Sequence, residues 1–100
     1  MVKSGDRRVG ASAETLGSYL ATFRKLLGLT VQQVAERAGV SRGTVSRLEA
    51  GDLGVSLGVL LAVCRALGVT DMLMSGMDPY ETALGRAQAD RMLPTRVRRS

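Results

Sequence analysis

The stretch that decides the fold runs from Thr30 to Ala50 and reads TVQQVAERAGVSRGTVSRLEA. Thr30 and Gln33 stand three residues apart, as the partners of a capping box do, so a helix should begin at residue 31. Gly39 should end it, because the position after a helix commonly takes a positive φ that a side chain resists. The apolar residues of this helix recur at one-turn spacing: Val34, Ala35 and Ala38. The sequence therefore predicts a short helix with one buried face.

A second short helix should follow directly. Ser41 is a favoured N-cap residue, Gly51 can end the helix, and Val40 can fill the corner between the two helices. The inward residues of the second helix are Val45 and Leu48. Its outward or N-terminal residues are Arg42, Gly43, Thr44, Ser46 and Arg47. We expect two helices joined by a tight glycine turn, the second with a basic outer surface.

Further helices should flank this pair on both sides. Before it, Ser12 precedes a helix that Gly28 ends, with apolar residues on one face: Leu16, Leu20, Phe23 and Leu27. After it, a helix should run from Ser56 to Gly68 and bury Leu57, Leu60, Leu61, Cys64 and Leu67. Thr70 can then cap a short helix over residues 71–74. The pattern predicts five helices in one compact domain.

The composition favours a small helical protein with a basic surface. Among 100 residues, 45% are hydrophobic but only 3% are aromatic, which suits a helical core better than a β-sandwich. The net charge of +5 fits a partner that carries phosphate. No stretch is apolar for long enough to span a membrane or to act as a signal peptide, so the expected location is the cytoplasm.

The same residues give no candidate catalytic site. The chain has no histidine, its carboxylates are scattered, and Gly51-Asp52-Leu53-Gly54 lacks the ending of a phosphate-binding loop. Cys64, the single cysteine, lies among leucines and should be a buried, inert thiol. We therefore expect no enzyme activity, no cofactor and no metal.

Three parts are expected along the chain. Residues 1–12 have no apolar period and should be a mobile basic arm, residues 13–76 should form the compact domain, and residues 77–100 should add a helix and a basic tail. In the middle part, Met72 and Met74 should fill a core or a dimer seam, as should Met77 just beyond it.

The last part carries its own helix signals. Asp78 can cap a helix that starts at Pro79, and Glu81 stands at its third position. This helix should reach about Met92 and stop at Pro94. Its apolar face is too narrow to fold alone and consists of Tyr80, Ala83, Leu84 and Ala87. We expect it to pack on another surface, either in a dimer or against a partner.

Residues 16–69 resemble the Cro and phage-repressor type, or XRE type, helix-turn-helix family. The matching string comprises Leu20, Arg24, Gly28-Leu29-Thr30, Val34-Ala35, Gly39-Val40-Ser41, Val45-Ser46-Arg47-Leu48-Glu49-Ala50-Gly51, Leu57 and Leu67-Gly68-Val69. The resemblance implies an all-α, five-helix, lambda-repressor-like DNA-binding domain, here with a short C-terminal helix and a basic tail. It also implies a homodimer on a palindromic operator, with the third helix in the major groove of double-stranded DNA.

The resemblance also assigns expected roles to single residues. The positions at which the family reads base edges hold Arg42, Gly43, Thr44 and Arg47. The positions expected near phosphate hold Lys25, Gln32, Gln33, Arg37 and Ser41. Arg24 and Glu49 occupy the positions of an ion pair that links the first helix to the recognition helix. Two phosphate contacts of the family are in question, because Val31 and Ala50 stand where it often has Gln and Asn.

A second interpretation concerns the C-terminal part. The segment from Asp78 to Arg99 is similar to what we would expect of XRE-type antitoxins that pair with HipA-type kinase toxins. Such a protein would repress its own operon while residues 78–99 contact the toxin or another protein partner. The function expected first is a sequence-specific transcriptional regulator, a repressor, and the antitoxin is the alternative.

Overall fold

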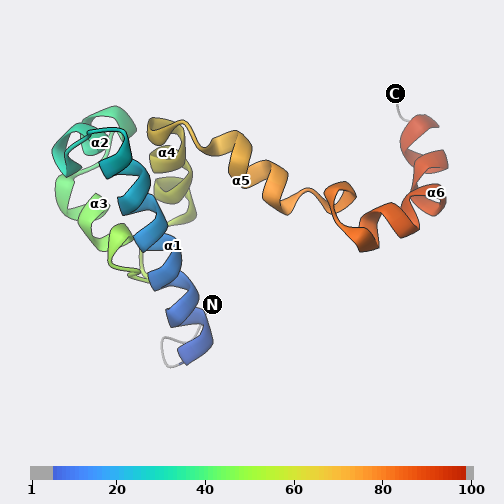
Figure 1. Cartoon of the computed structure of the whole chain (residues 1–100), viewed down its shortest axis with the longest axis horizontal. Helices are drawn as coiled ribbons and strands as arrows, with labels where there is room; N and C mark the ends of the chain where they lie inside the picture. Colours follow the sequence, from blue (N-terminus) through green and yellow to red (C-terminus); the bar gives the residue numbers. More distant parts are fainter. Residues whose placement is uncertain (1–5, 99–100) are drawn as a thin grey trace. The chain divides into compact units, whose positions relative to one another are not determined.

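The computed structural model describes the backbone of residues 6–98 and the side chains of residues 6–89 and 91. Its regular structure is helical throughout, which confirms the predicted all-α class. The helices in chain order are α1 (Arg7–Leu26), α2 (Val31–Ala38), α3 (Arg42–Glu49), α4 (Leu57–Leu67), α5 (Thr70–Met77), the 3-10 helix η1 (Pro79–Glu81) and α6 (Ala83–Arg98) (Figure 1). None of these helices is long and apolar enough to cross a membrane.

The chain divides into two compact units, the first ending at Thr70 and the second beginning at Asp71. The predicted end of the compact domain near residue 76 falls at the end of α5, a helix with no buried residue, and this boundary stays a prediction.

Helix α1 begins earlier than the sequence suggested. Asp6 is its N-cap, and one oxygen of its carboxylate accepts hydrogen bonds from the backbone N–H groups of Arg8 (2.9 Å) and Val9 (3.4 Å). The prediction that residues 1–12 form a mobile arm is therefore wrong from Arg7 onward, and residues 1–5 lie outside the described residues. The apolar period did not indicate these extra residues, because extending an existing helix costs little free energy and needs no apolar face.

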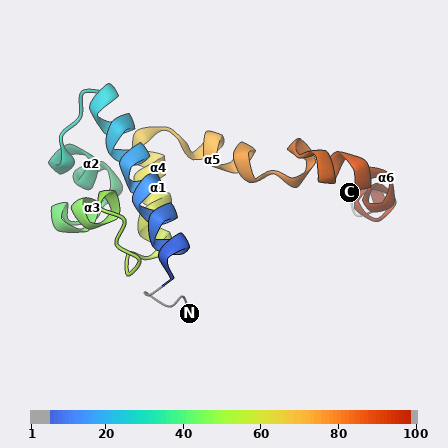
Figure 2. The ribbon, with the colours of Figure 1, turned by 60° about the horizontal axis from the view of Figure 1, so that its bottom comes forward.

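The core of the first unit lies where α1, α2, α3 and α4 meet. Helix α2 contacts both α3 and α4, while α1 contacts α3 (Figure 2). Among the described residues, the largest fully buried side chains come from three different helices: Val34, Val45 and Val63. The other buried core residues are Leu20, Ala35, Leu48, Cys64, Leu67 and Val69. Burial raises the pKa of the Cys64 thiol, which fits the expected inert cysteine.

Several leucines predicted to be buried are exposed instead. Leu57 is 69% exposed, and Leu16, Leu27 and Leu61 are also at the surface. Helix α4 is apolar on nearly every side, so its sequence period does not select a face, and the core closes on Val63, Cys64 and Leu67. The buried face of α4 is therefore determined by tertiary packing and not by the period of its sequence.

Two glycines allow α1 to lie very close to the end of α3. A Cβ atom placed on Gly17 would lie 2.5 Å from the carbonyl oxygen of Glu49 and 2.6 Å from that of Leu48. One placed on Gly51, whose φ is +82°, would lie 2.7 Å from the Cα atom of Glu14. Since no side chain fits at either position, the backbones themselves set the distance between α1 and α3.

The second unit differs from the single C-terminal helix that the sequence predicted. Asp78 caps the 3-10 helix η1 at Pro79 by accepting from the N–H of Tyr80 at 2.9 Å. Thr82 is then extended, so the predicted helix from Pro79 is divided into η1 and α6. Helix α6 also continues past Pro94 to Arg98, although proline removes one backbone donor from a helix. The predicted short helix over residues 71–74 is longer and runs to Met77.

Candidate nucleic-acid interface

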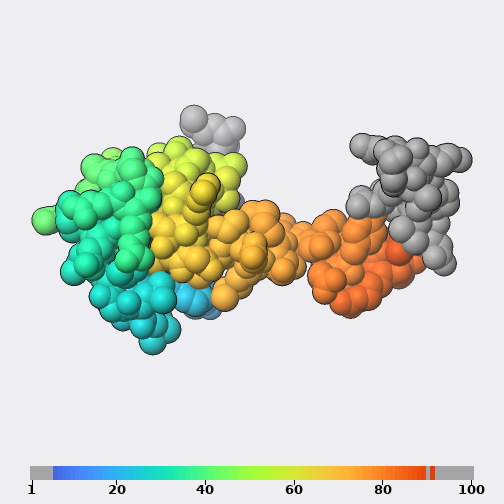
Figure 3. Space-filling model, turned by 90° about the horizontal axis from the view of Figure 1, so that it is seen from above, coloured from blue at the N-terminus to red at the C-terminus, as the bar shows by residue number. Residues whose placement is uncertain are grey.

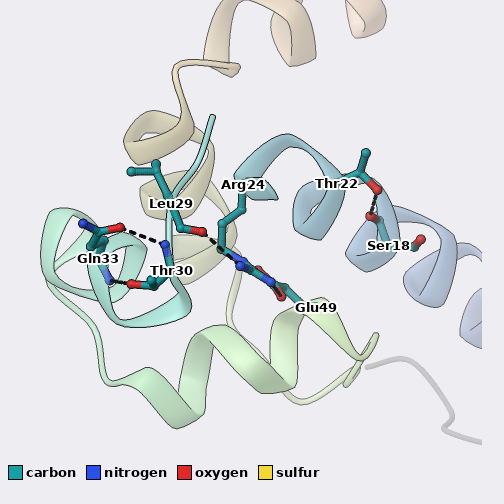
Figure 4. A network of polar contacts seen from close by, with 7 residues as sticks. All are labelled: Ser18, Thr22, Arg24, Leu29, Thr30, Gln33 and Glu49. Carbon is teal, nitrogen blue, oxygen red and sulfur yellow. Dashed lines mark hydrogen bonds and ion pairs between the residues drawn. The ribbon is translucent and has the colours of Figure 1, made fainter. Parts of the chain in front are cut away.

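Local capping fixes the turn between α2 and α3. Thr30 and Gln33 form the predicted capping box: the Thr30 hydroxyl accepts from the N–H of Gln33 at 3.0 Å, and the Gln33 amide oxygen accepts from the N–H of Thr30 at 2.9 Å (Figure 4). Gly39 takes a φ of +72°, and the next residue, Val40, donates its N–H to the carbonyl of Ala35 at 3.0 Å. These bonds determine the angle at which α3 leaves α2.

Helix α3 has one face in the core and one face open. Ser41 caps it by accepting from the N–H of Thr44 at 3.1 Å. Val45 and Leu48 are buried, as predicted, while Arg42 and Arg47 are exposed. Figure 3 shows that the segment containing α2 and α3, coloured teal to green, forms a side of the first unit that no other segment of this unit covers in this view. A basic helix face is therefore available to a large partner.

The four predicted base-reading positions differ in what they present. Arg42 and Arg47 offer exposed guanidinium groups. Gly43 offers no side chain, and a Cβ atom there would meet nothing within 4 Å. Thr44 is half-buried, and its hydroxyl shares a hydrogen bond of 2.7 Å with the Ser41 hydroxyl. Arginine is thus the main hydrogen-bond donor type that this face can direct at a base edge.

The predicted phosphate-binding residues are all exposed, and several already hold a hydrogen bond. These residues are Lys25, Gln32, Gln33, Arg37 and Ser41. The side-chain amide of Gln32 donates to Glu36 at 3.1 Å, whereas the caps use the oxygen atoms of Gln33 and Ser41. The NH₂ group of Gln33 keeps its donors for another partner. Lys25 and Arg37 lie in the last turns of α1 and α2.

Arg24 and Glu49 form an ion pair between α1 and α3. The Nε atom of Arg24 donates to Oε2 of Glu49 at 2.8 Å, and Nη2 donates to Oε1 at 3.1 Å (Figure 4). The Nη1 atom also donates to the carbonyl of Leu29 at 3.0 Å, and both charged side chains are only 12% exposed. The hydrogen bonds with Glu49 raise the pKa of Arg24. One guanidinium thus joins α1, the loop before α2 and the end of α3.

A second ion pair at the end of α3 was not predicted from the sequence. The Nε atom of Arg47 lies 3.7 Å from Oδ2 of Asp52, and both side chains are about half exposed. Gly51 could have indicated this pair, because a glycine that ends a helix turns the chain back and so places residue 52 beside residue 47.

Comparison with known proteins identifies the class to which this arrangement belongs. The profile of the helix-turn-helix domain family matches residues 15–75, which is more than half of the chain. The chain therefore belongs to the helix-turn-helix domain family, as its motif indicated.

One curated relative strengthens this assignment. An uncharacterized HTH-type transcriptional regulator of Methanothermobacter thermautotrophicus is 49% identical to this chain over 51 residues. The aligned region covers 51% of this chain and 74% of the relative. No solved structure gives a significant match.

Proposed function

We propose that this protein is a sequence-specific DNA-binding transcriptional regulator that inserts α3 into the major groove. The observation that carries the proposal is the position of Arg42 and Arg47 on the open face of a helix whose other face is fixed in the core. A preformed helix of this kind fits the major groove, and the arginine fork can donate two hydrogen bonds to guanine O6 and N7. The family match and the regulator among the relatives support the same function.

The proposed roles follow from the chemistry of each side chain. Arg42, Thr44 and Arg47 read base edges, and the bare backbone at Gly43 lets α3 come close to the groove. Phosphate contacts come from Lys25, Gln32, Gln33, Arg37 and Ser41, together with the first amides of α2. Among the described residues, no hydrogen bond uses the backbone N–H of Val31 or Gln32. These donors can serve an anion although Val31 itself has no polar side chain.

The proposed functional form is a homodimer of the XRE type that represses transcription from a palindromic operator. Two recognition helices on one face of the DNA would meet half-sites about 34 Å apart. Two surfaces could form the contact between the two protomers: α5 and the segment over residues 78–93. Large apolar side chains are exposed there: Met72, Met74, Met77 and Leu84.

The decisive experiment is selection of bound sequences from a random DNA pool with the purified protein at two salt concentrations. Enrichment of a palindrome that survives the higher salt is the expected result, and a reporter under that operator should then be repressed. Enrichment of no sequence at either salt concentration would contradict the proposal, because phosphate contacts alone give salt-sensitive binding without preference.

Replacing Arg47 with alanine should relax the preference for one base pair in each half-site. The variant loses a bidentate donor, so discrimination at that base pair should fall by about 1–3 kcal/mol. Competition titrations against operators changed at single positions measure this loss. Arg65→Ala is the matched control, because Arg65 is also exposed but lies on α4. Unchanged preference in Arg47→Ala would remove Arg47 from the base-reading set.

Replacing Lys25 with alanine should act in a different way. A phosphate contact carries no base information, so binding should weaken equally for all sequences. The slope of log affinity against log salt should become shallower by about one. Titrations at four or more salt concentrations, on operator and random DNA, test this. A sequence-dependent loss, or an unchanged slope, would place Lys25 away from the phosphates.

The antitoxin is the second candidate function. It is favoured by the second unit, in which no described side chain is buried and four large apolar side chains are exposed. Three of these side chains lie on α5 and one, Leu84, lies within residues 78–99. A toxin or another protein partner docked on residues 78–99 would cover Leu84, while α3 still bound the operon. Co-purification with the product of a neighbouring gene supports this form, and a homodimer that represses without it supports the free-standing regulator.

A further inference from the structure

The turn at the end of α3 has a regular geometry that brings Asp52 beside Arg47. The N–H of Gly51 donates to the carbonyl of Leu48 at 3.0 Å, and the N–H of Asp52 donates to the carbonyl of Arg47 at 3.0 Å. This is the pair of bonds of a Schellman motif, in which an apolar contact commonly joins the two positions that residues 47 and 52 occupy. Here the contact is an ion pair between two charged side chains.

The Asp52 carboxylate is itself held in place. Its Oδ1 atom accepts from the N–H of Gly54 at 2.7 Å, so that Oδ2 is left to face Arg47. The turn below it is fixed as well, because Gly51 lies so close to Glu14 on α1 that no Cβ fits between them. Asp52 is therefore an anchored group, whereas Arg47 is a long side chain with 59% of its surface exposed.

We infer that Asp52 is a positioning residue that sets the direction of the Arg47 guanidinium for base reading, which rests on the proposed function. The contact with Asp52 runs through Nε, and no hydrogen bond among the described residues uses the two terminal nitrogens of Arg47, so both can donate to one base. A guanidinium held at Nε loses fewer rotamers on binding, which favours the base that matches its fixed direction. Asp52 is also a negative charge at the DNA-facing helix, and so it weakens binding to every sequence.

The variant Asp52→Asn tests this inference with little change of shape. The Asn side chain keeps an oxygen that accepts from Gly54 but has no charge to hold Arg47. Discrimination at the base pair assigned to Arg47 should fall about two- to fivefold, the range for an exposed ion pair, while the other base pairs keep theirs. Affinity for random DNA should rise. Glu14→Gln is the control, because it removes the same charge near the same turn but forms no ion pair with Arg47.

A double variant separates positioning from simple repulsion. In an Arg47→Ala background, Asp52→Asn should no longer change discrimination at any base pair, although it should still raise affinity for random DNA. An equal loss of discrimination at all base pairs, or a change of discrimination that persists in the Arg47→Ala background, would overturn the inference and leave Asp52 as a repulsive charge. If Arg47→Ala itself leaves the preference unchanged, base reading by Arg47 fails first, and the inference fails with it.

Discussion

Replacing Glu49 with alanine should lower the free energy of unfolding by about 3 kcal/mol, the lower end of the range for breaking a buried ion pair. The loss follows because Arg24 would keep its charge at a site where only 12% of its side chain reaches water. Of its hydrogen bonds, Arg24 would then keep only the one that it donates to the Leu29 carbonyl. Urea unfolding, followed by circular dichroism at constant pH, measures the change.

The matched control is Glu36→Ala, on the exposed surface of α2, which should change stability by less than about 0.5 kcal/mol. A second check is the double variant Arg24→Met with Glu49→Leu. Replacing both charges with apolar groups removes the desolvation cost, so the double variant should be more stable than either single charge deletion. Equal losses in Glu49→Ala and Glu36→Ala would show that the Arg24–Glu49 pair contributes little.

Replacing Gly17 with alanine should be about as costly as losing the ion pair. The new methyl group would lie 2.5 Å and 2.6 Å from two backbone carbonyl oxygens of α3, which cannot rotate away as a side chain can. Overpacking of this kind costs about 3 kcal/mol at the upper end of its range, and relief requires α3 to move away from α1. Such a movement would also stretch the contact between Arg24 and Glu49, so operator affinity should fall as well.

Replacing Gly10, in the same helix, with alanine should have the opposite effect on stability. A Cβ atom at Gly10 meets nothing within 4 Å, so Gly10→Ala should stabilise the protein by about 0.5–1 kcal/mol through the better helix propensity of alanine. Melting temperatures of the two variants, measured side by side, should move in opposite directions. Stabilisation by Gly17→Ala would show that α1 and α3 do not approach as closely as the structure describes.

The sequence predicted the motif well because capping chemistry is local. The capping box of Thr30 and Gln33, the cap at Ser41 and the positive φ of Gly39 each depend on residues that are adjacent in the chain. The inward positions Val45 and Leu48 followed from helical period alone. For these reasons the two short helices, their turn and the open face of α3 follow from the sequence alone.

Contacts between distant segments could not be derived in this way. A glycine inside a helical pattern looks only like a weak helix former, and nothing near Gly17 indicates that a backbone from residues 48–49 lies against it. Likewise, the apolar residues of α4 surround the helix, so the face that becomes the core is decided by α2. The DNA roles of the exposed side chains stay predictions, since an exposed arginine has the same geometry whether or not it meets a base.

Cys64 gives this protein a built-in reporter of how often its core opens. Cys64 on α4 is only 2% exposed, and burial raises the pKa of its thiol, which disfavours the reactive thiolate. Reaction with a thiol reagent therefore requires the core around α4 to open, and the labelling rate follows the population of that open state. Because no other cysteine competes in the chain, one mass measurement per time point counts the molecules that have opened.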